Sequence, residues 1–248
     1  MRYPSFLQEQ GTIGFAAPSF GCATEPYKTA FLHAQEKLAG MGYRLDLGPN
    51  CYAREGIGIS NTPEKCGREL TEYLLTDKND ILISCGGGEL MCETLDFVDF
   101  DAIRKAQPKW YMGYSDNTNL TFLLTTLCDT ASVYGPCAGS FGMEPWHESI
   151  QDALDLLRGR KLVMKGYEKW EKEPYEADEN PLVPYHLTET RLLRSFPEGD
   201  STFSGRLIGG CMDCLVTLLG TRYDRVADFS KTYEQDGFIW FLESCDLN

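Results

Sequence analysis

The 248-residue sequence contains no apolar run approaching the ~20 residues that a membrane-spanning helix needs. Its N-terminus also lacks the apolar stretch and the small-residue cleavage site of a secretory signal peptide. Basic residues are few, 23 lysines and arginines against 37 aspartates and glutamates, and the formal net charge is −14. Nucleic-acid binding needs basic patches, which this balance does not favour. We therefore expect a cytoplasmic protein with no membrane and no nucleic-acid partner.

The cysteine patterns typical of zinc sites and disulfide scaffolds are also missing, although the chain has 10 cysteines. They are scattered, and the C-x-x-C formed by Cys211 and Cys214 has no second pair at zinc-finger spacing. We interpret the cysteines as buried, reduced thiols that pack as small hydrophobic groups. The sequence predicts no metal site and no cofactor.

The composition, 42% hydrophobic and 24% charged, is typical of a globular protein with a sizeable core. Apolar runs that we interpret as strands alternate with helical stretches: strands at 11–17, 43–47, 80–84, 110–114 and 132–136, and helices at 25–39, from 62 onward, and at 90–95, 118–127 and 151–157. This alternation predicts the α/β class, with a doubly wound, mostly parallel sheet of the flavodoxin or Rossmann type. Ligands of such sheets bind at the carboxyl ends of the strands.

Two turns follow consecutive predicted strands, so we expect them to be neighbours in space. The first, Gly113-Tyr114-Ser115-Asp116, joins a strand to a helix, an order that can hold a serine out of the backbone as a nucleophile. Alternatively, Ser115 or Asp116 only caps the helix. The second turn, 86–88, is rich in glycine. It could cradle a phosphate, supply an N–H to an oxyanion hole, or simply be a tight turn.

The character of the chain changes after the predicted domain at 1–150. We predict a linker at 151–204, which contains an acidic, aromatic insertion, and an incomplete second α/β domain at 205–248. The insertion is either a solvated linker or a loop that leans over the site and brings Trp170 to the substrate. The last segment is predicted to contain a helix at 213–219 and a buried strand, 237–243, which ends in the carboxylate of Glu243.

A series of short motifs occurs in one order along the chain: Ala17-Pro18-Ser19, Gly86-Gly87, Gly113-Tyr114-Ser115-Asp116, Tyr134-Gly135-Pro136, the glycine-rich run 205–210, Leu219-Gly220-Thr221 and Phe241-Leu242-Glu243. The series resembles the serine peptidase family that includes the LD-carboxypeptidases and the microcin C immunity peptidases. The long aromatic insertion makes the chain more similar to the microcin-immunity branch. The resemblance implies hydrolysis of an amide bond in a small peptide or peptidyl-nucleotide, and a possible homodimer.

The resemblance also implies a Ser-Glu-His triad. Ser115 would be the nucleophile, and Glu243 would orient the histidine. The backbone N–H groups of Asp116 and Gly87 would form the oxyanion hole. Further candidates, for substrate binding, are Gly86, Trp170 and Asp246.

The chain departs from the family pattern at the histidine. It has three histidines, and none follows Glu243, where the family places the base. We expect none of them to replace it: His33 should face solvent on a helix, His147 should start a helix, and His186 lies in the insertion. The chain is therefore interpreted as a C-terminally truncated member, nearly inactive alone. Glu89 is a second departure, because the family usually has glycine there.

Two other functions remain open at this point. The sheet and its glycine turn could form a non-catalytic module that binds a nucleotide or a peptide. Alternatively, Cys85 or Cys137 could be the nucleophile of a cysteine hydrolase, since Cys85 lies at a strand end.

Overall fold

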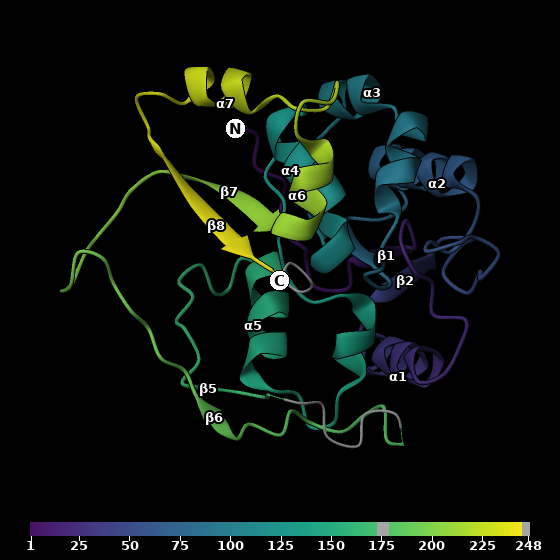
Figure 1. Ribbon diagram of the computed structural model, residues 1–248. Coiled ribbons are helices and arrows are strands. Elements are labelled where there is room, and N and C mark those ends of the chain that lie inside the picture. The colour runs from purple at the N-terminus through teal and green to yellow at the C-terminus, as the bar shows by residue number, and fades with distance from the viewer. Residues whose placement is uncertain (173–178, 245–248) are drawn as a thin grey trace.

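The computed structural model describes residues 1–172 and 179–244. Its centre is a parallel sheet in the order β2-β1-β3-β4, and Figure 1 shows β1 and β2 side by side. The strands are β1 (Thr12–Ala16), β2 (Arg44–Leu47), β3 (Ile81–Ser84) and β4 (Trp110–Met112). The segments that connect or follow them are α1 (Tyr27–Gly40), α2 (Pro63–Leu75), η1 (Met91–Phe97), α3 (Phe100–Lys105), η2 (Ser115–Asn117), α4 (Thr118–Thr126), η3 (Ala138–Gly142) and α5 (Glu148–Leu157), where η denotes a 3₁₀ helix. The predicted α/β class with a parallel sheet is confirmed.

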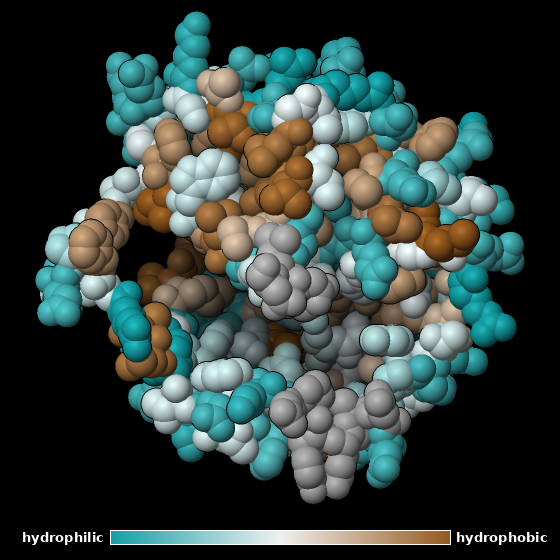
Figure 2. Space-filling view, viewed as in Figure 1, coloured by the Kyte–Doolittle hydropathy of each residue, from teal (hydrophilic) through white to brown (hydrophobic). Residues whose placement is uncertain are grey.

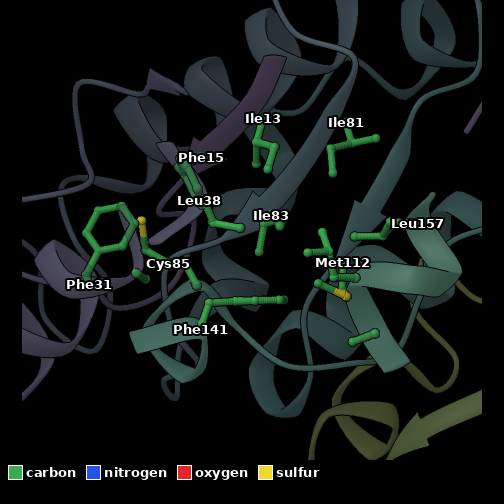
Figure 3. Packing of buried hydrophobic residues seen from close by; sticks show 14 of the residues in the cluster. Ile13, Phe15, Phe31, Leu38, Ile81, Ile83, Cys85, Met112, Phe141 and Leu157 are labelled. Atoms are coloured by element: carbon green, nitrogen blue, oxygen red, sulfur yellow. The ribbon is translucent and has the colours of Figure 1, made fainter. Parts of the chain in front are cut away.

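Helices cover both faces of the sheet because successive strand residues point to opposite sides. On one face, the side chains of Ile13, Ile83 and Met112 pack with α1, η3 and α5 (Figure 3). On the other face, Leu82 and Tyr111 pack with residues of α2, α3 and α4. Burying an aliphatic or aromatic side chain of this size stabilises a fold by about 1.5–3 kcal/mol. These two cores fix the strand ends from which the functional turns emerge.

The remaining described elements are β5 (Lys169–Trp170), β6 (Glu189–Thr190), β7 (Arg206–Cys211), α6 (Met212–Leu218), α7 (Val226–Thr232) and β8 (Phe238–Glu243). β7 and β8 form a parallel pair. A third hydrophobic cluster joins β7 and α6 to α4. In it, Ile208 and Leu218 pack against Phe122 and Leu123. Figure 2 shows apolar side chains gathered over α6, where Val216 and Leu219 are half-exposed or more.

Gly210 allows β7 to approach the start of α4 closely. Its φ is +141°, and a Cβ there would lie 2.6 Å from Thr118 Cγ2 and 2.7 Å from Thr118 Oγ1. The next residue, Cys211, donates its backbone N–H to Thr118 Oγ1 at 2.9 Å. Gly210 therefore fixes how the β7–β8 pair, and with it Glu243, meets α4.

Gly210→Ala is expected to lower the free energy of unfolding by about 2 kcal/mol, because it adds both a strained φ and a collision with Thr118. Gly199→Ala is the matched control, since Gly199 has φ +119° but no atom within 4 Å of the added Cβ. Denaturant unfolding of the two variants measures the difference. Equal losses in both would contradict the packing of Gly210 on Thr118.

Several sequence predictions differ from the structure. Residues 132–136 do not form a strand; they make a single parallel bridge, from Val133 to Met112. The N–H of Gly135 still donates to the carbonyl of Gly113 at 3.4 Å, and the pairing stops there because β4 ends at Met112 and the chain turns at Ser115. The segment at 90–95 is the 3₁₀ helix η1 rather than an α-helix, and α5 begins at Glu148, before the predicted start. The bounds of the other predicted elements agree with the structure to within a few residues, but the strand at 237–243, predicted to be buried, is mostly exposed as β8. In the described ranges no helix is both long and apolar enough to cross a bilayer.

Candidate active site

Ser115 is the first residue of η2, in the short turn between β4 and α4. Its φ is +60°, an uncommon and strained value for a residue with a side chain. Its backbone N–H donates a hydrogen bond to Tyr134 Oη at 2.8 Å. The turn therefore presents the serine hydroxyl in the manner of a nucleophile elbow.

The glycine turn lies directly against Ser115, as expected for turns that follow neighbouring strands. A Cβ placed on Gly87 would lie 3.2 Å from Ser115 Cβ and 3.3 Å from Ser115 Oγ. Among the described residues, the backbone N–H groups of Gly87 and Asp116 donate to no other group. Two backbone donors are thus free beside the hydroxyl, which is the requirement for an oxyanion hole.

Asn117 locks the two turns together. Its side-chain amide donates to the carbonyl of Gly86 at 2.9 Å and to that of Tyr114 at 3.0 Å. Its amide oxygen accepts from the hydroxyl of Tyr111, a buried β4 residue. Gly86 therefore contributes to the site through its carbonyl, which holds the glycine turn against the serine turn.

The carboxylate of Asp116 is buried, with 2% of the residue exposed. It accepts hydrogen bonds from Ser19 Oγ at 2.6 Å, Met91 N at 2.9 Å and Asn119 Nδ2 at 2.9 Å. Burial raises the pKa of Asp116 above its ordinary value, although these donors oppose the rise. The side chain ties the turn to the neighbouring loops, and no backbone N–H of α4 bonds to it in the described structure, so it does not cap α4.

Glu243 reaches the serine turn through Tyr134. The phenol of Tyr134 donates to Glu243 Oε1 and accepts the N–H of Ser115. Phe241, two residues before Glu243 on the same face of β8, packs its ring 5.6 Å from the ring of Tyr134. Burial, with Glu243 beside it, raises the pKa of Tyr134 well above its ordinary value, so the phenol stays protonated. A cavity of about 1000 Å³ adjoins this contact and is lined by Tyr134, Phe241 and residues of β7.

The remaining substrate-binding candidates are less closely placed. Trp170 is 48% exposed in the β5–β6 pair, and no hydrogen bond of the serine turn involves it. Asp246 lies outside the described residues. Between the extended segment that precedes β7 and the body of the molecule, the surface is hollowed (Figure 2).

The histidines are engaged elsewhere. The expectation that His33 faces solvent is wrong: α1 packs on η3, and His33 Nδ1 lies 2.6 Å from the carbonyl oxygen of Gly142. His147 starts α5 as predicted, and its Nδ1 accepts from Ser149 N. The backbone N–H of His186, in the insertion, donates to Glu171.

The cysteines do not favour thiol catalysis. Most of the described cysteines are buried and all of them are free thiols, as the sequence predicted. Burial raises the pKa of Cys85 and raises that of Cys137 to about 12, which disfavours the reactive thiolate. Within the described ranges, no group of three or more His, Cys, Asp or Glu residues is arranged to hold a metal ion.

Sequence reasoning missed three residues that build the site: Ser19, Asn117 and Tyr134. Each had a weak signal, because Ser19 belongs to a motif that follows a predicted strand, Tyr134 belongs to a motif within one, and Asn117 lies two residues after the serine. Their hydrogen-bond partners lie in other segments, which local patterns do not identify.

A serine in a strained turn beside free backbone N–H groups is an arrangement that serine hydrolases use, and comparison with known proteins points in the same direction. Residues 13–135 match the family model described as the LD-carboxypeptidase N-terminal domain. This match agrees with the resemblance that the motif series indicated. The microcin C7 self-immunity protein MccF of Escherichia coli is 28% identical over 219 residues, which cover 86% of this chain and 62% of MccF. A candidate carboxypeptidase of Vibrio cholerae is 26% identical, over 90% of this chain and 66% of that protein.

Solved structures show the same fold. MccF in complex with aspartyl sulfamoyl adenosine aligns with a TM-score of 0.78 and 26% identity, over 96% of this chain and 70% of that one. An MccF-like protein from Bacillus anthracis aligns with a TM-score of 0.78 and 24% identity, over 100% of this chain and 71% of the other. The chain spans 62–66% of the length of the curated relatives that it matches.

Proposed function

We propose that this chain carries the nucleophile, the oxyanion hole and the orienting carboxylate of a serine hydrolase that cleaves an amide bond. The observation that carries the proposal is the position of Gly87 against Ser115 Oγ, with the N–H groups of Gly87 and Asp116 free beside it. A serine at positive φ next to two free backbone donors has little structural benefit of its own, whereas acyl transfer needs this arrangement.

In the proposed reaction, Ser115 Oγ attacks the carbonyl carbon of the amide while a base removes the hydroxyl proton. The N–H groups of Gly87 and Asp116 stabilise the oxyanion of the tetrahedral intermediate. Its collapse breaks the C–N bond, the amine leaves with the proton, and water then hydrolyses the acyl-serine ester. Glu243 holds the base by accepting its N–H. Because the described contacts of His33 and His147 lie elsewhere, we assign the base to a group other than these two.

A small peptide or peptidyl-nucleotide substrate is the best-supported class. MccF structures hold aspartyl sulfamoyl adenosine and glutamyl sulfamoyl guanosine, which join an amino acid to a nucleoside. MccF is 28% identical to this chain, and the LD-carboxypeptidase family model covers the segment with both turns. The cytoplasmic location expected from the sequence and the homodimer implied by the resemblance stay predictions, as do the domain boundaries at 150 and 204.

The nucleophile is tested by treating the chain with a fluorophosphonate in the absence and presence of imidazole, which can act as an external base. We expect Ser115 to become phosphonylated, with loss of fluoride, at a rate that rises with imidazole concentration. Ser115→Ala should abolish the labelling, and the surface variant Ser149→Ala should retain it. Intact mass and peptide mapping locate the adduct. Labelling that survives in Ser115→Ala, or no labelling of the wild type, would contradict the proposal.

A non-catalytic binding module is the second candidate, because no histidine of this chain has a described contact with Ser115. Calorimetry with aspartyl sulfamoyl adenosine, on wild type and Ser115→Ala, separates the two functions. Equal binding to both proteins, together with no fluorophosphonate adduct on the wild type, would favour the binding module.

A further inference from the structure

The phenol of Tyr134 joins two groups of the candidate site that come from distant parts of the sequence. It accepts the backbone N–H of Ser115 at 2.8 Å and donates its own proton to Glu243 Oε1. Tyr134 follows the bridge that Val133 makes with Met112 at the end of β4, so its backbone is fixed to the same strand end as the serine turn. Its ring is held from the other side by Phe241.

The bond from Ser115 N–H to Tyr134 decides whether the backbone of Ser115 can donate to an oxyanion. With its N–H engaged by Tyr134, Ser115 has no backbone donor left for an oxyanion. The oxyanion hole is therefore restricted to the free N–H groups of Gly87 and Asp116. The same bond also stabilises the turn at φ +60°, a conformation that costs free energy unless its surroundings hold it.

The second bond determines how Glu243 is oriented. Oε1 accepts from Tyr134, whereas Oε2 has no hydrogen-bond partner among the described residues. Because Glu243 is exposed at the end of β8, its side chain would otherwise sample several rotamers. The phenol selects an orientation in which one oxygen is occupied and the other is open to the N–H of a base.

We propose that Tyr134 is a positioning residue that sets both the serine turn and the free oxygen of Glu243. The inference rests on the proposed function and adds a residue to it. Tyr134 is not itself the base, because burial and the adjacent carboxylate keep its phenol protonated.

The test is Tyr134→Phe, which keeps the ring against Phe241 and removes only the hydroxyl. The readout is fluorophosphonate labelling of Ser115 in the full chain with imidazole, analysed for the limiting rate and the half-saturating probe concentration separately. We expect the limiting rate to fall on the order of tenfold, with the half-saturating concentration unchanged. The exchange rate of the Ser115 amide proton should rise in the same variant, because its acceptor is gone.

Tyr167→Phe is the matched control. Tyr167 also donates to a carboxylate, Asp152 Oδ2 at 3.0 Å, and it has no bond to the serine turn. Removing the hydroxyl of Tyr167 should change neither the labelling rate of Ser115 nor the exchange rate of its amide proton. The comparison separates a general loss of phenol–carboxylate bonding from the specific role of Tyr134. Thermal unfolding of each variant checks that the fold is retained.

A double-mutant cycle with Glu243→Gln completes the design. If Tyr134 acts through Glu243, the two substitutions together should slow labelling by less than the product of their separate effects. A wild-type labelling rate in Tyr134→Phe, or fully multiplicative effects in the cycle, would overturn the role of Tyr134 while leaving the nucleophile intact. Absence of labelling in the wild type would overturn both the proposed function and this role.

Discussion

Asp116→Ala is expected to lower the free energy of unfolding by about 3 kcal/mol. The substitution leaves the hydroxyl of Ser19 and the N–H of Met91 buried without an acceptor, and each such loss typically costs about 1–3 kcal/mol. The amide of Asn119 keeps one partner, the backbone carbonyl of residue 116. Urea unfolding followed by circular dichroism measures the change.

Asp116→Asn is the control for this effect, because it keeps the shape and one acceptor oxygen. Its loss should be smaller, about 1 kcal/mol. If alanine and asparagine destabilise equally, the hydrogen bonds to Ser19 and Met91 contribute nothing and the role given to the carboxylate is wrong. A destabilised but folded Asp116→Ala should also label poorly at Ser115, since the turn loses its anchor.

The pH dependence of the same pair tests the charge state of Asp116. Because burial raises the pKa of Asp116 in the folded chain, folding favours the protonated form. The difference in unfolding free energy between the wild type and Asp116→Asn should therefore be largest below about pH 4, the ordinary pKa of an aspartate. It should decrease as the pH rises through the raised pKa of Asp116 in the folded chain. Unfolding free energies of both proteins between acid and neutral pH give the difference. A wild-type advantage that grows with pH would mean a lowered pKa.

The sheet and the two functional turns could be predicted because their signals are local. Strands such as Ile81–Ser84 are short apolar runs, and the glycines after them mark where each strand ends. Parallel strands place their carboxyl ends at one edge of the sheet, and β3 and β4 are also paired neighbours, so the turns that follow them bring Gly87 against Ser115. Glu243 was found through the motif series rather than through any local pattern.

The predictions that were wrong depend on contacts between distant segments, which a local sequence pattern does not contain. Residues 132–136 have the pattern of a strand, but β4 ends at Met112 and turns away, so they make only the bridge at Val133 and the bond from Gly135 N–H to Gly113. The pattern of its own helix predicts that His33 is exposed. Its partner, the carbonyl oxygen of Gly142, lies in η3, more than a hundred residues later in the chain. The bonds from Ser19 to Asp116 and from Tyr134 to Glu243 span 97 and 109 residues, so only the folded chain brings these groups together.

Gly87→Ala is expected to reduce fluorophosphonate labelling of Ser115 by about 10²-fold. The new methyl group would stand 3.2–3.3 Å from the Cβ and Oγ of Ser115, tighter than an ordinary contact, on the side from which an electrophile must reach the hydroxyl. Ser115 has little freedom to retreat, because Tyr134 holds its N–H and Asn117 holds the carbonyl before it. A displacement of this kind in a reacting group commonly costs about two orders of magnitude in rate.

Gly139→Ala serves as the control for Gly87→Ala, because its added Cβ would meet only Ala30 Cβ at an ordinary 3.9 Å. It should label at the wild-type rate. Since alanine retains the backbone N–H, the loss in Gly87→Ala reports crowding of the hydroxyl and not removal of an oxyanion donor. Labelling of Gly87→Ala within twofold of wild type would mean that the electrophile approaches Ser115 from another side, and the oxyanion hole would then have to be reassigned away from the glycine turn.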